Sequence, residues 1–325
     1  MENIYLTTVA INGFGRIGRC LARIITDERK DLELVKINAT GDKHVNTHLL
    51  NFDSVHGRWE SDIDVEWTHT RNINLLNWKD VDIVLECTGQ FRDASKSSVH
   101  LENGARNVLI SSPGINVDRT VVYGVNHRDI TKEDNIISSA SCTTNCLAPI
   151  VKVLNDNFGI IRGSMTTIHS YTGDQATIDR RHDDLYRARA AALSMIPTTT
   201  GAAKALKSVL PEMEGKIIGS AIRVPTPNVS CIDLHFYSEQ DVDVETVNEL
   251  VKTASENEMK GIIGFETRPL VSMDFNTTKE SCIFAADSTL VCGKLVRVLC
   301  WYDNEWAFSN RMADTASYIG VLNEY

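Results

Sequence analysis

One cysteine of the chain stands in a setting that suits a reactive thiol. Cys142 lies in the run Ser138-Ser-Ala-Ser-Cys142-Thr-Thr-Asn-Cys146, just ahead of an apolar segment over 147–154. That order is typical of a helix start, where unpaired backbone N–H groups and the helix dipole favour a thiolate over a thiol. The run therefore indicates a nucleophilic cysteine.

A histidine later in the chain is the candidate partner of this thiol. His169 lies in the run Thr166-Thr-Ile-His169-Ser-Tyr-Thr172-Gly-Asp174-Gln, within an expected strand. Cysteine–histidine pairs lower the pKa of the thiol and shuttle protons, so His169 is a candidate base for Cys142. The alternative is a histidine with a purely structural role.

A glycine-rich run near the N-terminus predicts a dinucleotide site. Gly13, Gly15 and Gly18 follow an apolar strand expected over 6–12 and open a helix expected over 16–26, which is the context that the fingerprint requires. Such glycines permit a tight turn, close approach to a pyrophosphate, and close packing of helix and strand. The alternative is a glycine-rich turn without a ligand. A bound nicotinamide beside an activated thiol predicts oxidation of an aldehyde through a thioester.

The elements that position these residues change in kind at the reactive cysteine. Before it, strands and helices alternate, which predicts a Rossmann-type, doubly wound parallel sheet in an α/β fold. After it, longer strands predict an α+β catalytic domain with a mostly antiparallel sheet. We expect a dinucleotide-binding domain over 1–141, completed by a C-terminal helix over 306–325, and a catalytic domain over 142–305.

The individual elements follow from runs of apolar residues and their period. Further strands of the first domain are expected over 33–38, 82–87, 107–111, 120–123 and 135–138, and a helix over 94–103. In the second domain helices are expected over 147–157, 202–210 and 244–256, and strands over 164–171, 217–223, 230–237, 270–274, 281–285 and 295–302. Residues 174–200 lack strand alternation and carry many charges, and a connection of that length is usually functional.

Composition excludes several other classes of protein. A length of 325 residues agrees with two domains, and the net charge of −10 argues against a nucleic-acid partner bound by general electrostatics. No apolar run predicts a membrane span and no signal sequence is expected, so we predict a cytoplasmic enzyme. None of the eight cysteines forms a CxxC pair, so no metal site is expected. A disulfide between Cys142 and Cys146 is the alternative for a secreted protein.

Motifs along the whole chain resemble the glyceraldehyde-3-phosphate dehydrogenase family. They are INGFGRIG, SASCTTNC, TTIHSYTGDQ, RARAAA, IPTTTGAAKAL, RVPTPNVS, PLVSMDF and WYDNEW, in collinear order. The resemblance implies a homotetramer that oxidises D-glyceraldehyde 3-phosphate with NAD(P)+ and inorganic phosphate to 1,3-bisphosphoglycerate, in glycolysis or gluconeogenesis. The alternatives are an erythrose-4-phosphate dehydrogenase and a non-catalytic binding protein on the same fold.

The resemblance also implies a role for each matching residue. Cys142 would attack the aldehyde, and His169 would accept a proton as hydride leaves for the nicotinamide. The substrate phosphate would bind Thr172, Asp174 and Arg223, and inorganic phosphate would bind Ser141, Thr143, Arg187, Thr200 and Gly201. Cofactor contacts are implied for Gly13, Phe14, Gly15, Arg16, Ile17, Gly18, Asn38, Ala39, Thr40, Arg71, Thr88, Gly89, Ser111, Arg180, Arg181, Asn304 and Phe308.

The departures from the family pattern concentrate near the 2′-position of the adenosine ribose. Ala39 replaces the acid that accepts a hydrogen bond from the ribose 2′-hydroxyl in NAD-specific enzymes, with Thr40 beside it and Arg71 near the same position. Arg180 and Arg181 replace a Leu-Pro pair in a loop that reaches the neighbouring subunit's cofactor in this family. These changes predict that the enzyme accepts NADP.

Two further features leave alternatives open. Arg180 and Arg181 could instead form surface ion pairs with Asp183 and Asp184, in which case NAD would remain the cofactor. Phe308 stands where the family has a tyrosine, so it keeps ring contact with the nicotinamide but cannot make a hydrogen bond.

Overall fold

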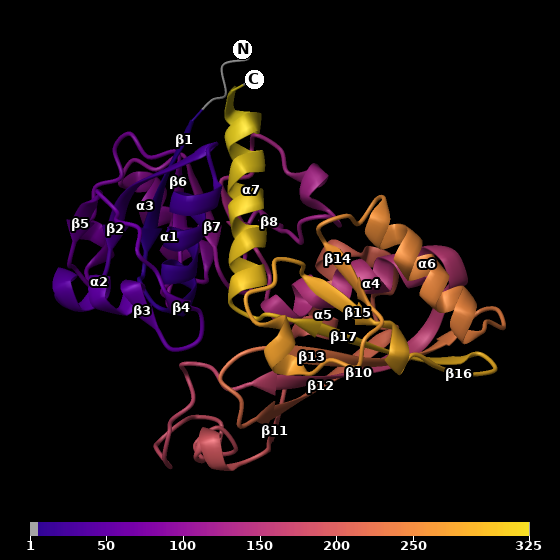
Figure 1. The fold of residues 1–325 in the computed structure, drawn as a ribbon. Helices are drawn as coiled ribbons and strands as arrows, with labels where there is room; N and C mark the ends of the chain where they lie inside the picture. Colours follow the sequence, from indigo (N-terminus) through magenta and orange to yellow (C-terminus); the bar gives the residue numbers. More distant parts are fainter. Residues whose placement is uncertain (1–5, 325) are drawn as a thin grey trace. The chain divides into compact units, whose positions relative to one another are not determined.

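The computed structural model describes residues 6–324, whose contacts divide into two compact units (Figure 1). Among the described residues, the first unit comprises 6–141 and 309–324, and the second comprises 142–308. No helix in the described part of the chain is both long and apolar enough to cross a bilayer.

The first unit is built on a seven-stranded sheet in which all pairs are parallel. Its order is β5-β2-β1-β6-β7-β9-β8, with β1 at Thr7–Asn12, β2 at Leu32–Asn38, β5 at Glu66–Thr68, β6 at Ile83–Glu86, β7 at Asn107–Ile110, β8 at Arg119–Thr120 and β9 at Ile136–Ser138. The central strands are buried on both faces, which is why they read as continuous apolar runs. The predicted doubly wound parallel sheet is confirmed.

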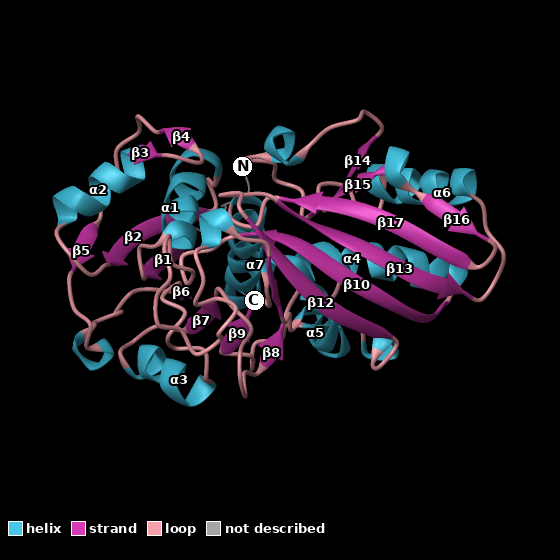
Figure 2. Cartoon of the chain, turned by 90° about the horizontal axis from the view of Figure 1, so that it is seen from below, coloured by secondary structure: helices cyan, strands magenta, loops and turns pink. Residues whose placement is uncertain are grey.

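Helices cover both faces of this sheet. They are α1 at Arg16–Glu28, α2 at Lys43–Asn51 and α3 at Ala94–Glu102. Figure 2 shows α1 and α3 on opposite faces, as right-handed crossovers from a central strand require. Helix α7 spans Trp306–Glu324, and its part in the first unit packs on β1, where a Cβ on Gly320 would lie 1.9 Å from Thr7 Oγ1.

The second unit contains a mixed sheet of eight strands with helices on one face (Figure 2). Its order is β11-β12-β10-β13-β17-β15-β14, with β16 paired to β17. The strands are β10 at Ile160–Ser170, β11 at Ile196–Thr198, β12 at Ile217–Val224, β13 at Ser230–Ser238, β14 at Ile263–Glu266, β15 at Cys282–Ala285, β16 at Leu290–Cys292 and β17 at Leu295–Tyr302. The helices are α4 at Cys142–Phe158, α5 at Ala202–Val209 and α6 at Val244–Glu256. Most pairs are antiparallel, as predicted; β10 with β12 and β14 with β15 are parallel.

Some elements differ from the sequence-based expectations. The strand expected over 270–274 is wrong: Ser272–Phe275 form a 3-10 turn. Asp274 accepts a hydrogen bond from the backbone N–H of Val271, and Phe275 is buried. This local capping replaces strand pairing. Helix α4 begins at Cys142, a turn earlier than the expected 147–157, and α2 was missed because its short sequence mixes polar and apolar residues.

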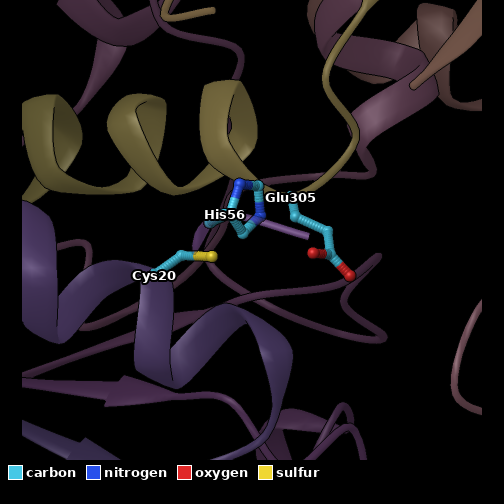
Figure 3. Close-up of side chains that lie close together, drawn as sticks. All are labelled: Cys20, His56 and Glu305. Atoms are coloured by element: carbon cyan, nitrogen blue, oxygen red, sulfur yellow. The ribbon is translucent and has the colours of Figure 1, made fainter. Parts of the chain in front are cut away.

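An ion pair fixes the segment that follows α2 in the first unit. Arg16 of α1 donates to Asp53, whose carboxylate also accepts from the backbone N–H groups of Val55 at 2.9 Å and His56 at 3.0 Å. The turn places His56 next to Cys20 of α1 (Figure 3). Burial raises the pKa of Asp53, but Arg16 and the two N–H groups outweigh it and lower that pKa to about 2.

We expect Asp53→Asn to lower the free energy of unfolding by about 2 kcal/mol at pH 7. The pKa of this carboxyl is lower in the folded than in the unfolded protein, so its charged form stabilises the folded state at pH values above the unfolded pKa. The difference from wild type should shrink as the pH falls from about 4 towards 2, where the native carboxylate takes up its proton. Urea unfolding of variant and wild type at both ends of this pH range measures the difference in their free energies of unfolding. Asp64→Asn, at an exposed position, is the control; an equal loss at both pH values would contradict the assignment.

Candidate active site

The reactive cysteine and its candidate base lie together in the second unit. Cys142 is the first residue of α4, and its Sγ lies 3.5 Å from Nε2 of His169 near the end of β10. Nδ1 of His169 lies 2.7 Å from the carbonyl oxygen of Ser170. A carbonyl oxygen only accepts, so Nδ1 carries the proton and the lone pair of Nε2 faces the thiol.

Burial controls the protonation of this pair. It raises the pKa of the Cys142 thiol above its usual value, although Arg223 and hydrogen bonds from Thr143 act in the opposite direction. Burial, followed by Arg223, lowers the pKa of His169 to about 3. Burial thus acts against the thiolate that the sequence predicts at the helix start, and the reactive thiolate stays a prediction. The geometry places the thiol opposite an imidazole nitrogen that can accept its proton.

A buried tyrosine that the sequence did not single out supports the pair. The hydroxyl of Tyr302 lies 2.9 Å from Oγ1 of Thr143 and 2.9 Å from Oγ1 of Thr167, and its ring meets His169 edge to face at 6.0 Å. The hydroxyl of Thr143 thus contacts Tyr302, and hydrogen bonds from its side chain and its backbone also reach the Cys142 thiol, so an anion here would share these donors with the thiol. Ser141, expected at the same anion site, is adjacent to Cys142 in the chain and ends the first unit.

Next to the histidine lies an arginine that can hold an anion. Arg223 of β12 pairs in register with His169, and its Nη1 donates to the carbonyl of Ser170 at 3.0 Å and to Oγ1 of Thr172 at 2.9 Å. Its Nε is buried without a partner, and no carboxylate of the described residues forms an ion pair with it. Asp174 accepts from Thr172, so it reaches the arginine through that hydroxyl rather than directly. A half-satisfied guanidinium suits a phosphate.

Three of the five residues expected to hold inorganic phosphate, Arg187, Thr200 and Gly201, lie in the segment that precedes α5, whereas Ser141 and Thr143 lie at the start of α4. Arg187 donates to Asp174 at 3.0 Å and to Oγ1 of Thr198 at 3.1 Å. Gly201 is the N-cap residue of α5, and Oγ1 of Thr200 accepts from the backbone N–H of the following turn at 3.2 Å. The segment therefore brings a guanidinium, a hydroxyl and helix-start N–H groups into one part of the chain, which is a suitable set for an anion.

The asparagine expected at the nicotinamide has a fixed orientation. Oδ1 of Asn304 accepts from Oγ of Ser170 at 2.9 Å and from Oγ of Ser230 at 3.0 Å. Its Nδ2 group can therefore donate a hydrogen bond, which is what the carboxamide oxygen of a nicotinamide would need. Neither serine was identified from the sequence. Phe308 is buried, at 4% exposure.

A cavity of about 570 Å³ lies in the first unit, above the carboxyl ends of β1, β2 and β6. This is where dinucleotides bind in open α/β sheets. Of the expected cofactor residues, Gly13, Phe14, Gly15, Asn38, Ala39, Thr40, Arg71 and Thr88 line it. The expected residues of this unit that do not line it are Arg16, Ile17, Gly18, Gly89 and Ser111.

The three fingerprint glycines have distinct roles in this unit. Gly13 has a φ of +99°, and a Cβ there would lie 2.7 Å from the backbone nitrogen of Thr88. A Cβ on Gly18 would lie 2.2 Å from the carbonyl oxygen of Gly13, so this glycine permits close packing. A Cβ on Gly15 would meet nothing within 4 Å, and Gly15 caps α1 without a side-chain bond, so the helix start is open to a pyrophosphate.

The arginine pair of the long segment is exposed and forms no local ion pair. Within residues 6–324, neither Arg180 nor Arg181 pairs with Asp183 or Asp184. Asp184 instead pairs with Arg187 at 3.5 Å. The alternative of local surface ion pairs is therefore absent from the described structure.

Comparisons with known proteins cover both units. Residues 7–94 match the family model described as the NAD binding domain of glyceraldehyde 3-phosphate dehydrogenase, and residues 141–304 match its C-terminal domain. Proteins named glyceraldehyde-3-phosphate dehydrogenase from Cereibacter sphaeroides and Xanthobacter flavus are each 54% identical, over 97% of this chain and 98% of their own length. A protein of that name from Geobacillus stearothermophilus is 49% identical over 96% of this chain and 97% of its own.

Proposed function

The chain belongs to the glyceraldehyde-3-phosphate dehydrogenase family, and we propose that it carries out that family's reaction through a thioester on Cys142. The observation that carries the proposal is the 3.5 Å approach of the Cys142 thiol to the lone pair of His169, which pairs in register with Arg223. Thiol, base and anion-binding cation are the groups that this chain would supply to oxidation of a phosphorylated aldehyde, and the bound cofactor would supply the hydride acceptor.

Each proton of the proposed reaction passes through His169. Sγ of Cys142 adds to the aldehyde carbon while Nε2 takes the thiol proton and delivers it to the carbonyl oxygen, giving a hemithioacetal. Nε2 then accepts the hydroxyl proton as the carbon loses hydride, leaving a thioester. Inorganic phosphate attacks the thioester, the sulfur leaves, and the imidazolium returns its proton to the sulfur. NAD, when bound, supplies the hydride acceptor.

Initial rates test this function directly. Purified enzyme should reduce NAD or NADP with D-glyceraldehyde 3-phosphate, and turnover should depend on inorganic phosphate. A higher kcat/KM for erythrose 4-phosphate, with turnover independent of phosphate, would favour an erythrose-4-phosphate dehydrogenase. Absence of turnover with either aldehyde would favour a non-catalytic binding protein.

We expect Arg223→Ala to lower kcat/KM for glyceraldehyde 3-phosphate by about 30-fold, because charge-assisted hydrogen bonds to the phosphate are lost. The value for unphosphorylated glyceraldehyde should change little, since that substrate lacks the anion. Arg162→Ala, at an exposed position on β10, is the control. An equal loss for both aldehydes would place Arg223 outside the phosphate site.

The cofactor site supports use of NADP as well as NAD. Ala39 is buried at the end of β2, where the family has an acid, and Arg71 lines the cavity without an ion pair among the described residues. Arg180 and Arg181 add positive charge on a loop that approaches the neighbouring subunit's cofactor in this family. A 2′-phosphate would meet arginines rather than a carboxylate.

Ala39→Asp should therefore reduce kcat/KM for NADP by about tenfold or more, because like charges about 5 Å apart repel by about 3 kcal/mol at an effective dielectric near 20. The value for NAD should be kept or improved. Thr40→Ser, which keeps the hydroxyl at the neighbouring position and adds no charge, is the matched control. A tenfold or greater preference of the wild-type enzyme for NAD would contradict the NADP proposal.

Apolar side chains exposed on the second unit support the proposed homotetramer. They include Leu185 at 81%, Leu193 at 82%, Met195 at 76% and Ile218 at 72% exposure. Side chains of this kind are suited to burial between subunits. Sedimentation equilibrium tests the assembly.

A further inference from the structure

A buried carboxylate beside the dinucleotide cavity has no part in the reaction described above. Glu86 ends β6 and is 1% exposed. Its Oε2 accepts from Nδ2 of Asn12 at 2.5 Å and lies 3.0 Å from Nε2 of His100. Its Oε1 accepts from the backbone N–H of Thr88 at 2.8 Å and from the hydroxyl of the same residue. These donors fill the acceptor capacity of a carboxylate.

The orientation of the histidine in this cluster is fixed from its far side. Nε1 of Trp78, which can only donate, donates to Nδ1 of His100 at 2.9 Å. Nδ1 must therefore accept, so Nε2 carries the proton and donates to Glu86. Trp78 and His100 are fully buried, so water cannot replace either contact.

Two asparagines extend these oriented hydrogen bonds from the Glu86 carboxylate to the edge of the cavity. Oδ1 of Asn12 accepts from Nδ2 of Asn38 at 2.7 Å. Oδ1 of Asn38 accepts from Oγ1 of Thr68 at 3.0 Å and from the backbone N–H of Thr70 at 3.2 Å, and its Nδ2 also donates to the carbonyl of Thr70 at 3.1 Å. The amide of Asn38 is thus fully used within the protein, and only its backbone can contact a cofactor.

We propose that Glu86 is a positioning residue for the adenosine ribose end of the dinucleotide. Its carboxylate fixes the orientation of the Asn12 amide, which fixes the orientation of the Asn38 amide. The Asn38 amide in turn holds residues 68–70 next to Arg71. Asn38 also precedes Ala39, so the chain of hydrogen bonds ends next to Ala39 and Arg71, which both line the cavity. This inference rests on the proposal that the cavity binds the dinucleotide.

An amide in place of the carboxylate would break this order. In Glu86→Gln, the introduced NH2 group would face either the N–H of Thr88 or the donors of Asn12 and His100. If Asn12 turned to accept, its NH2 would face that of Asn38. If the amide of Asn38 also turned, its NH2 group would face the backbone N–H of Thr70 and its Oδ1 would face the carbonyl oxygen of Thr70. Each arrangement leaves buried donors unpaired.

The test measures NAD binding by isothermal titration calorimetry without aldehyde. Glu86→Gln should raise the Kd by about tenfold or more, and Glu102→Gln, an exposed carboxylate on α3, should leave it unchanged. The double variant Asn12→Asp with Glu86→Gln exchanges carboxylate and amide. The glutamine NH2 group can then donate to the new carboxylate, which still accepts from Asn38, and only the contact with Nε2–H of His100 stays opposed, so the double variant should bind NAD more tightly than either single variant.

The outcomes separate the two proposals. Failure of the wild-type protein to bind NAD would overturn the proposed cofactor site. A folded Glu86→Gln variant that binds NAD within about twofold of wild type, or a double variant no tighter than the singles, would overturn the positioning role. If Glu86→Gln does not fold, Thr68→Val removes one donor to Asn38 at the cavity edge and should raise the Kd by about threefold; an unchanged Kd would overturn the role.

Discussion

Cys142→Ser should lower the rate of aldehyde oxidation by about a thousandfold or more, because a hydroxyl is a far weaker nucleophile than a thiol beside a neutral imidazole. The expected effect is on kcat rather than on NAD binding, because the cavity in the first unit does not include this residue. Absorbance of the reduced cofactor in the first turnover measures it.

A matched control lies one turn further along α4. Cys146 is fully buried, and burial raises the pKa of its thiol to about 11, so Cys146→Ser should keep near wild-type activity. Mass spectrometry adds a second readout: without phosphate, the wild-type chain should gain an acyl group on Cys142. Full activity of Cys142→Ser, or an acyl group on another residue, would refute the thioester route.

His169→Asn should slow acylation by about 10² to 10⁴-fold at pH 7, because Nε2 is the acceptor positioned for the thiol proton. Without that base the reaction depends on the thiolate fraction of Cys142. Since burial raises the pKa of this thiol, the fraction increases as the pH rises into the alkaline range. The deficit of the variant should therefore narrow with rising pH.

The wild-type enzyme should show a weaker dependence, because the pKa of His169 is about 3 and its imidazole is already neutral at mildly acidic pH. Rapid-mixing measurements of the first turnover from about pH 6 to about pH 9 compare the two. His235→Asn, at an exposed histidine on β13, is the control. A deficit that stays constant with pH would mean that His169 does not take the thiol proton.

Much of the fold and part of the site could be predicted from short stretches of the sequence. The apolar strands and the glycines at 13, 15 and 18 are local signals, and they predicted the parallel sheet and the turn into α1. Cys142 and His169 were identified from short runs and the family resemblance, and the structure brings them together. These features depend on residues that are close in the chain or on a motif that the family shares.

What the sequence did not predict depends on contacts between distant residues. The thiol was expected to favour its thiolate, but its pKa is raised because Cys142 is enclosed by elements that no local pattern describes. Tyr302 contacts Thr143 and Thr167 from the far end of the chain. The link from Trp78 through His100 to Glu86 likewise joins residues that look unremarkable in sequence.

One peptide carbonyl has a consequence for the size of the substrate. The oxygen of Ser170 accepts both from Nδ1 of His169 and from Nη1 of Arg223, so the proposed proton acceptor and the proposed phosphate-binding cation share one rigid anchor. The span from reacting carbon to phosphate is then set by the backbone rather than by flexible side chains. An aldehyde with one more carbon would have to fold its own chain to fit, so we expect the enzyme to select substrates by length.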